Sequence, residues 1–317
     1  MTARILPLII ALSLLSAACG HESETQPGMD EPTLVAHLYP KGQGVDEGII
    51  EDGVAITLGP GSANQCDTTE FYWERDGSLN CVGDSARVVV YLPEKRNGVM
   101  VVVCPGGGYN ELMYRSEGTY AAKEMTAHGV SVAILCYRMP TGHHDIPLTD
   151  AQNAFRFLRH HAAGWGISKI GIMGMSAGGH LAATASTLYT DSVTRPDFTI
   201  LFYPVVSFCD GLGHKGSMRR LGLDESLIER YSAEKNVTPD TPPALLFHSA
   251  DDGVNPEHSI RYYQALRKAG VQAGLVIFPS GGHGWGFNTI QTAGRDKLEP
   301  WRAAFNDALY TFLDSQN

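Results

Sequence analysis

The sequence predicts an α/β fold, a three-layer sandwich in which helices cover both faces of a mostly parallel central sheet. Several short runs of β-branched and other apolar residues are continuous rather than alternating, which is typical of strands buried on both faces. These runs alternate with helical patterns along most of the chain, and glycines follow several of them. Apolar residues make up 43% of the 317 residues, which is enough to bury a large core.

The individual elements follow from these patterns in chain order. The predicted strands share an apolar run bounded by glycine, proline or polar residues, and they lie at 86–93, 98–109 (running into glycines), 130–138, 169–175, 197–204, 242–249 and 272–279. The predicted helices share apolar positions three or four residues apart, and they lie at 118–129, 148–166, 176–189, 256–270 and 298–316. The alternation of predicted strands and helices is interrupted around 205–240, so we expect an insertion there, close to the ends of the strands. No internal repeat is present.

The N-terminal segment has the pattern of an export signal. A single basic residue, Arg4, precedes an apolar run at 5–15, and small residues then lead to Cys19. We interpret residues 1–18 as a signal peptide of the lipoprotein type and Cys19 as the lipidated residue that anchors the chain to a membrane. The polar residues 20–35 are expected to form a flexible tether, and residues 36–317 the folded domain. The expected location is periplasmic or on the cell surface.

Charge and cysteine content limit the partners. The formal net charge is −10 and no Lys/Arg-rich cluster occurs, so nucleic acid is a poor candidate partner. Cys66 and Cys81 lie in an irregular stretch of a chain expected to be exported, and a disulfide between them is an open possibility. The other three cysteines after Cys19 sit at the ends of apolar runs and are expected to be small buried side chains; they are Cys104, Cys136 and Cys209.

The stretch Gly-Met-Ser-Ala-Gly at 174–178 joins a predicted strand to a predicted helix. A serine at such a sharp turn needs a strained backbone, and Gly174 and Gly178 remove side chains that would clash. The turn raises the hydroxyl of Ser176 above the sheet edge, at a helix N-terminus that favours negative charge. This is the G-x-S-x-G nucleophile elbow, and it predicts that Ser176 is a nucleophile.

A serine nucleophile needs a base and a carboxylate that orients the base. In folds with this elbow the chain order is serine, acid, histidine. His283 follows the strand at 272–279 in a glycine-rich loop, and two aspartates follow the strand at 242–249. Asp251 fits the Asp-x-x-Val pattern with Val254, whereas Asp252 does not, so Asp251 is the favoured acid.

Attack on a carbonyl also needs donors for the oxyanion. The Cys-Pro-Gly-Gly-Gly-Tyr stretch follows the strand that begins at residue 98, and its glycines allow backbone N–H groups to reach a substrate. We expect donors from Gly107 and Gly108, together with the N–H of Ala177 after the nucleophile. No motif or histidine–cysteine spacing suggests a metal or cofactor, and we expect none.

These motifs resemble the α/β-hydrolase superfamily, over most of the chain from residue 86 onward. Within it, the Pro-Gly-Gly-Gly-Tyr stretch, Glu117-Gly118 and the Leu-Tyr-Pro-Lys-Gly segment at 38–42 are similar to exported bacterial acetyl xylan esterases and other carbohydrate acetyl esterases. A histidine common before the glycines is replaced by Pro105. The resemblance implies a serine carboxylesterase that hydrolyses acetyl or other short acyl esters on xylan or related plant carbohydrates, without a cofactor.

Two other functions fit parts of the sequence. The Ala-Asp-Asp-Gly-Val stretch also suits serine exopeptidases of the prolyl-oligopeptidase branch, although the chain before residue 86 is too short for the propeller that such enzymes usually carry. A non-catalytic surface binding protein on a hydrolase scaffold is the third hypothesis. An intact set of serine, acid and histidine argues against it.

Overall fold

A computed structural model of the chain describes residues 34–35, 54–60, 72–73, 77–82 and 85–317. The predicted signal peptide, the lipidated Cys19, nearly all of the tether and Cys66, with its possible disulfide to Cys81, lie outside the described residues. None of the helices in the described part of the chain has the length and apolar character needed to cross a membrane.

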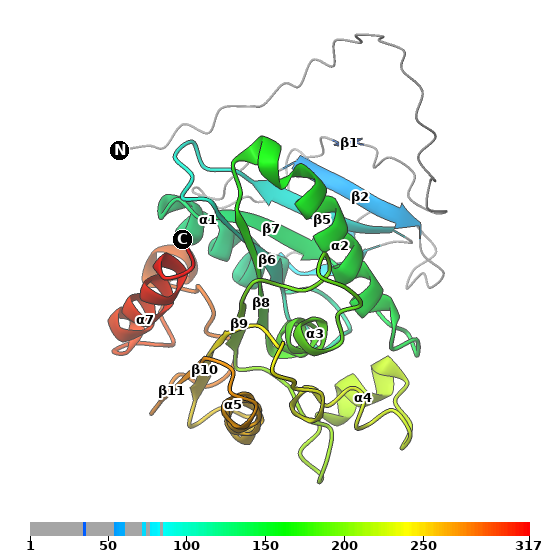
Figure 1. Cartoon of the computed structure of the whole chain (residues 1–317). Coiled ribbons are helices and arrows are strands. Elements are labelled where there is room, and N and C mark those ends of the chain that lie inside the picture. The colour runs from blue at the N-terminus through cyan, green and yellow to red at the C-terminus, as the bar shows by residue number, and fades with distance from the viewer. Residues whose placement is uncertain (1–33, 36–53, 61–71, 74–76, 83–84) are drawn as a thin grey trace, which may run out of the picture.

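A nine-stranded sheet forms the middle layer of the described structure (Figure 1). The spatial order is β1-β2-β5-β7-β6-β8-β9-β10-β11. From β7 to β11 all neighbours are parallel, and β1, β2, β5 and β7 pair antiparallel. The strands of this sheet are β1 (Leu34–Val35), β2 (Val54–Pro60), β5 (Ser85–Tyr91), β6 (Val99–Cys104), β7 (Ser131–Cys136), β8 (Lys169–Met175), β9 (Thr199–Phe202), β10 (Ala244–Ser249) and β11 (Ala273–Phe278). A separate small hairpin pairs β3 (Tyr72–Trp73) with β4 (Leu79–Cys81).

Helices form the two outer layers. In Figure 1, α1 (Tyr120–Ala127) and α7 (Arg302–Asp314) lie on one side of the sheet, and α2 (Ile146–Ala162), α3 (Ser176–Thr187) and α5 (Glu257–Lys268) lie on the other. The remaining helices are short: η1 (Tyr114–Thr119), η2 (Ala163–Trp165), α4 (Lys215–Leu221), η3 (Ala233–Lys235) and α6 (Ile290–Ala293). The predicted three-layer α/β sandwich with a mostly parallel sheet is therefore confirmed.

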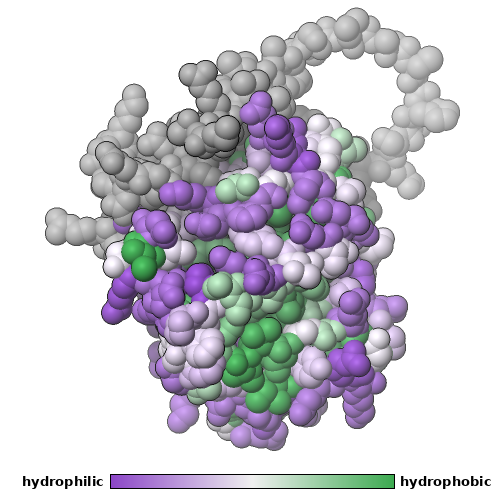
Figure 2. Space-filling view, turned by 90° about the vertical axis from the view of Figure 1, so that its left-hand side faces the viewer, coloured by the Kyte–Doolittle hydropathy of each residue, from purple (hydrophilic) through white to green (hydrophobic). Residues whose placement is uncertain are grey.

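The central strands are the ones with continuous apolar sequence. Every residue of β6, β7, β9 and β10 is buried, because helices cover both faces of the sheet there. The edge strand β11 is more exposed, with Ile277 at 37%. Figure 2 shows the side of the molecule on which β11 lies; it is mainly hydrophilic, with one apolar area in its lower half.

The segment between β9 and β10 is irregular, as expected for an insertion near the strand tips. It contains only α4 and η3 as helices within residues 203–243. The structure also differs from the sequence pattern after β6, where a π-helical turn, η1, precedes α1. Such turns have no clear hydrophobic period, and they occur often at functional sites.

An aromatic cluster packs the C-terminal part of the sheet. Phe202 of β9 lies at its centre, with ring centroids 5.4 Å from Phe247, 5.6 Å from Trp285, 5.6 Å from Phe287 and 5.3 Å from Phe305. All five side chains are nearly or fully buried. The cluster joins β9 and β10 to α7 and to the loop after β11.

Replacing Phe202 by alanine is expected to lower the free energy of unfolding by about 3–5 kcal/mol, because the variant loses a fully buried ring and leaves a cavity among other rings. Urea unfolding of both proteins would measure this difference. Ile290→Ala is the control: its side chain is 59% exposed, so its effect should stay within about 0.5 kcal/mol. Equal stability of Phe202→Ala and the wild type would contradict the packing role of the cluster.

Candidate active site

Ser176 lies at a strained turn between β8 and α3. Its φ is +53°, a left-handed conformation that non-glycine residues rarely adopt. A Cβ on Gly174 would clash with the backbone of Gly178, and a Cβ on Gly178 would clash with the carbonyl of Cys104 in β6. The two glycines therefore allow the strand, the helix and the start of the next loop to approach closely, as the elbow motif predicts.

Three side chains form a hydrogen-bonded chain at the carboxyl edge of the sheet. The Nε2 atom of His283 is 2.9 Å from Oγ of Ser176, and its Nδ1 atom is 2.9 Å from both carboxylate oxygens of Asp252. A carboxylate only accepts, so Nδ1–H donates to Asp252 and Nε2 is left to accept the Ser176 hydroxyl proton. This arrangement suits a serine nucleophile with a histidine base.

The acid at this position is Asp252, and the prediction of Asp251 is wrong. Asp251 is exposed and its Oδ1 accepts a hydrogen bond from the backbone N–H of Gly282 at 2.8 Å. Asp251 therefore holds the loop that carries His283 rather than the imidazole itself.

A local turn explains why the second aspartate points inward. Oδ1 of Asp252 accepts the N–H of Val254 at 2.7 Å, an Asx-type turn that fixes the carboxylate two residues before Val254. The carboxylate has no exposed surface, and Nε2 of the buried His248 lies 3.6 Å from its Oδ2. The Asp-x-x-Val pattern identified the correct turn, but it selected the first aspartate of the pair, whereas the second one contacts His283.

The loop that carries His283 is fixed from its C-terminal side. Nη1 of Arg302 donates to the carbonyl of Gly286 at 2.8 Å, and the guanidinium also pairs with Asp296 at 2.7 Å. Nε1–H of the buried Trp285 donates to Oγ of Ser249 at 3.0 Å. These contacts hold the loop on α7 and β10, so the imidazole is presented from a rigid support.

The glycine-rich loop after β6 lies beside Ser176. A Cβ on Gly106 would be 3.0 Å from Cβ of Ser176 and 2.8 Å from the carbonyl oxygen of Met175. Gly107 and Gly108 have φ values of +123° and +65°, conformations that favour glycine. Ala177 follows Ser176 in the first turn of α3. One predicted oxyanion donor, Ala177, is therefore next to the nucleophile in the sequence, and the other two belong to the neighbouring loop after β6. Their role stays a prediction.

Tyr109 closes the glycine-rich loop and is held from α3. Its hydroxyl is 2.7 Å from Nδ1 of the buried His180, and Nε2 of His180 is 2.8 Å from the carbonyl of Tyr231. Burial lowers the pKa of His180 to about 4. His180 is thus a structural residue, and His248, which contacts Ser259 and Val254, is one as well.

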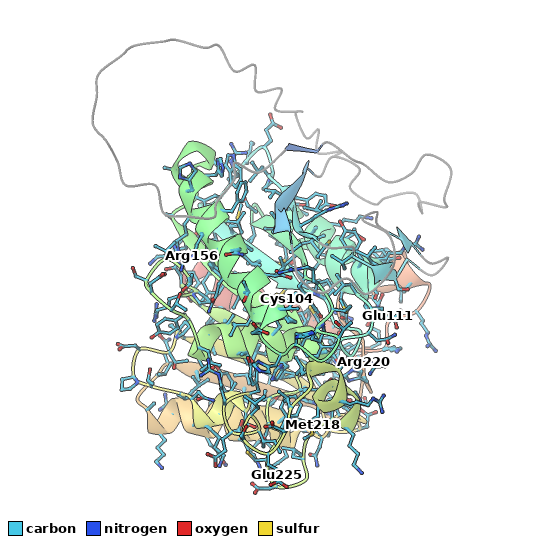
Figure 3. All side chains as sticks on the ribbon, turned by 90° about the vertical axis from the view of Figure 1, so that its right-hand side faces the viewer. Cys104, Glu111, Arg156, Met218, Arg220 and Glu225 are labelled. Carbon is cyan, nitrogen blue, oxygen red and sulfur yellow. The ribbon has the colours of Figure 1, made fainter. Side chains whose placement is uncertain are left out.

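The segment after β9 covers the other side of the loop. Nε of Arg220 in α4 donates to Oδ1 of Asn110 at 3.3 Å. Figure 3 shows Arg220 and Met218 on the side of the molecule that also carries Glu111. The segment thereby contacts the glycine-rich loop through Arg220, which also reaches the carbonyl of Gly108 at 3.5 Å.

Sequence reasoning did not single out two buried residues beside the site. Tyr203 follows β9, and its ring centroid is 4.8 Å from that of His283. Glu117, in η1, is 4% exposed and accepts hydrogen bonds from Gly106 and Tyr203. Burial raises the pKa of Glu117, and these two hydrogen bonds oppose the shift. The Glu-Gly pair was noticed only as part of a family resemblance, since nothing in its spacing reveals the contact.

The remaining cysteines and histidines form no metal site among the described residues. Cys104, Cys136 and Cys209 are free and buried, which confirms the expectation for them. His143 and His144 lie in the loop before α2, and His160 and His161 lie at its end.

Comparison with known proteins agrees with this geometry. Residues 88–200 match the BD-FAE family, and residues 220–303 match the prolyl oligopeptidase family. The crystal structure of an acetyl ester-xyloside bifunctional hydrolase from Caldicellulosiruptor lactoaceticus is similar, with a TM-score of 0.63 and 32% sequence identity over 72% of this chain and 88% of that one. The chain belongs to the α/β-hydrolase superfamily.

Other relatives point in the same direction. The chain is 41% identical over 223 residues to an acetylxylan esterase from Xylanibacter ruminicola, which is 67% of this chain and 46% of that protein. A sugar hydrolase from Lactococcus lactis has a TM-score of 0.66 and 27% identity, over 78% of this chain and 98% of that one. The chain thus spans less than half the length of the acetylxylan esterase that it matches.

The acid assignment can be tested by the rate at which a fluorophosphonate labels Ser176. Asp252→Asn should slow labelling by about 10³–10⁴-fold, because asparagine favours the wrong tautomer of His283. Asp251→Asn should slow it by less than about tenfold, since it weakens one hydrogen bond to the loop. Circular dichroism would confirm that both variants fold. The reverse order of effects would restore Asp251 as the acid.

Proposed function

We propose that the protein is a serine esterase that removes acetyl and other short acyl groups from xylan or related plant carbohydrates. The observation that carries this proposal is the Ser176–His283–Asp252 chain beside a glycine-rich loop. The relatives named as an acetylxylan esterase and an acetyl ester-xyloside hydrolase support the choice of acetylated carbohydrate.

In the acylation step, His283 removes the Ser176 hydroxyl proton as Oγ attacks the ester carbonyl. Asp252 keeps the imidazole oriented and stabilises the imidazolium that forms. The carbonyl oxygen becomes an oxyanion, and we expect the N–H groups of Gly107, Gly108 and Ala177 to bind it. The oxyanion then collapses and the bond from the acetyl carbon to the sugar oxygen breaks. His283 gives its proton to that oxygen, so the sugar leaves with a free hydroxyl and an acetyl-serine remains.

In the deacylation step, His283 takes a proton from water as the water oxygen attacks the acetyl carbonyl. The same N–H groups bind the second oxyanion. Collapse releases acetate, and the proton on His283 returns to Oγ of Ser176. The reaction is complete with water as the only co-substrate, so the side chains of the site suffice without a cofactor.

A second candidate is a serine exopeptidase, because residues 220–303 match the prolyl oligopeptidase family. That match covers the acid and the histidine, which esterases of this fold also use. The likeness to the acetyl ester-xyloside hydrolase extends over 72% of this chain and 88% of that one, and it favours the esterase. Measurements with an Xaa-Pro anilide beside acetyl esters separate the two.

We also propose that the chain is exported and anchored through lipidated Cys19 in the periplasm or on the cell surface. The apolar run at 5–15 and the small residues before Cys19 support this. An external location would bring the enzyme to polysaccharides that cannot enter a cell.

Ser176→Ala should lower the hydrolysis of p-nitrophenyl acetate by at least about 10⁴-fold, because no other group replaces the nucleophile. The wild type should hydrolyse the acetate faster than the butyrate and octanoate esters and release acetate from acetylated xylan. Thermal unfolding would show that the variant is folded. A near wild-type rate in Ser176→Ala, or faster cleavage of the Xaa-Pro anilide than of the esters, would reject the proposed function.

Cys19→Ser in the full-length chain should move the protein from the detergent phase to the aqueous phase in Triton X-114 partitioning of a bacterial expression host. The thiol that receives the lipid is absent in this variant, and the signal peptide is otherwise intact. Esterase activity in each phase would report the distribution. If wild type and Cys19→Ser partition alike, the anchor is not at Cys19.

A further inference from the structure

The carboxylate of Glu117 lies under the active site and uses both oxygens as acceptors. Its Oε2 accepts the backbone N–H of Gly106 at 2.6 Å, and its Oε1 accepts the hydroxyl of Tyr203 at 2.9 Å. The side chain is 4% exposed. These two donors come from different segments, the glycine-rich loop after β6 and the end of β9, so one carboxylate connects both.

The first contact fixes the peptide next to the predicted oxyanion donors. Gly106 precedes Gly107 directly, and its carbonyl accepts the N–H of Met113 at 3.0 Å. The residue is therefore held on both sides, by Glu117 at its N–H and by Met113 at its carbonyl. Any shift of Glu117 would move the backbone that carries the N–H groups of Gly107 and Gly108.

The second contact reaches the histidine. The Tyr203 ring lies edge-on to the ring of His283, with centroids 4.8 Å apart, and is 5.0 Å from that of Trp285. A Cβ on Gly286 would be 3.1 Å from the Tyr203 hydroxyl oxygen. Tyr203 is also held in a left-handed conformation, with φ at +37°. The hydroxyl bond to Glu117 orients a ring that supports the imidazole.

Stability alone does not account for a carboxylate at this place. Removing a charged group from water is unfavourable unless donors compensate, and an apolar side chain could fill the same volume. The chain instead forms a π-helical turn, η1, that brings Glu117 under the loop. We therefore expect the carboxylate to act by fixing the positions of its two donors, Gly106 and Tyr203.

We propose that Glu117 is a positioning residue that holds the glycine-rich loop and the His283 support in one relative placement, through Gly106 and Tyr203. This inference rests on the proposed serine-hydrolase chemistry of the site. Glu117 touches neither substrate nor the reacting atoms. Its effect is on how well the N–H groups of Gly107 and Gly108 meet the oxyanion while His283 faces Ser176.

The oxyanion exists only in the transition state and the tetrahedral intermediates, so a displaced loop affects kcat more than KM. Glu117→Leu removes both acceptors and should lower kcat for p-nitrophenyl acetate by about 10²–10³-fold, as the loss of an oxyanion donor does. KM should change by less than about threefold.

Two conservative variants each weaken only part of the hydrogen bonding of Glu117. Glu117→Gln keeps the shape and one acceptor oxygen, and Tyr203→Phe removes only the hydroxyl bond. Each should lower kcat by about tenfold, the loss of roughly one hydrogen bond. Glu124→Gln is the matched control, because it removes a carboxylate from the neighbouring helix α1 without a contact to either loop, and it should behave as the wild type.

Two further readouts separate positioning from a structural role. Titration with a fluorophosphonate counts active sites, so kcat is given per titrated site, and thermal unfolding reports stability. The inhibition constant of a phenylboronic acid, whose serine adduct places an oxygen at the oxyanion position, should rise in parallel with the loss of kcat. A residue that only stabilises the fold would lower the titrated fraction and leave these values unchanged.

Wild-type kcat per titrated site and wild-type boronic acid inhibition in Glu117→Gln and Tyr203→Phe would overturn the inference, even if Glu117→Leu did not fold. Failure of the proposed function is distinguishable: the wild type would then not hydrolyse esters. The rate of fluorophosphonate labelling still tests Glu117 in that event, because the phosphoryl oxygen of the reagent occupies the same oxyanion position.

Discussion

The crossing of β8, α3 and the loop after β6 at the elbow is the constraint on which the site depends. Ser176 holds a left-handed backbone there, and Gly174 and Gly178 permit contacts that any side chain would prevent. A strained serine of this kind persists only where the surrounding packing fixes it. The buried strands and the helices on both faces supply that packing, so the hydroxyl is presented in one direction before any substrate arrives.

Parallel strands then bring the other groups to the same edge. The glycine-rich loop follows β6, Ser176 follows β8, Asp252 follows β10 and His283 follows β11. Because the carboxyl ends of parallel strands lie at one edge, residues more than a hundred positions apart meet within hydrogen-bond distance. The aromatic cluster around Phe202 and the Arg302–Asp296 pair fix the loop after β11, which carries His283.

The sequence sufficed for the features that depend on pattern. Continuous apolar runs predicted the sheet, and a serine between two glycines at a strand–helix junction predicted the elbow. The choice between Asp251 and Asp252 could not be made this way, because it depends on an Asx-type turn in which Asp252 accepts the N–H of Val254, while Asp251 accepts the N–H of Gly282. The roles of Tyr203 and Glu117 could not be predicted for a similar reason: each contacts backbone groups or rings of distant segments, and Glu117 stands out in the sequence only through the family resemblance.

Asp252 and Glu117, the buried carboxylates described beside the site, face different groups and therefore have different roles. Asp252 faces an imidazole that becomes charged during the reaction, so its charge is compensated most when the base holds the proton. Glu117 faces two neutral donors, Gly106 and Tyr203, whose number does not change during the reaction. These two hydrogen bonds can therefore stay the same through the cycle, as expected of a group that holds geometry, while the charge on His283 adds a weaker electrostatic attraction. Asp252 bonds to the base directly, whereas Glu117 holds the glycine-rich loop and the Tyr203 ring that packs against the base.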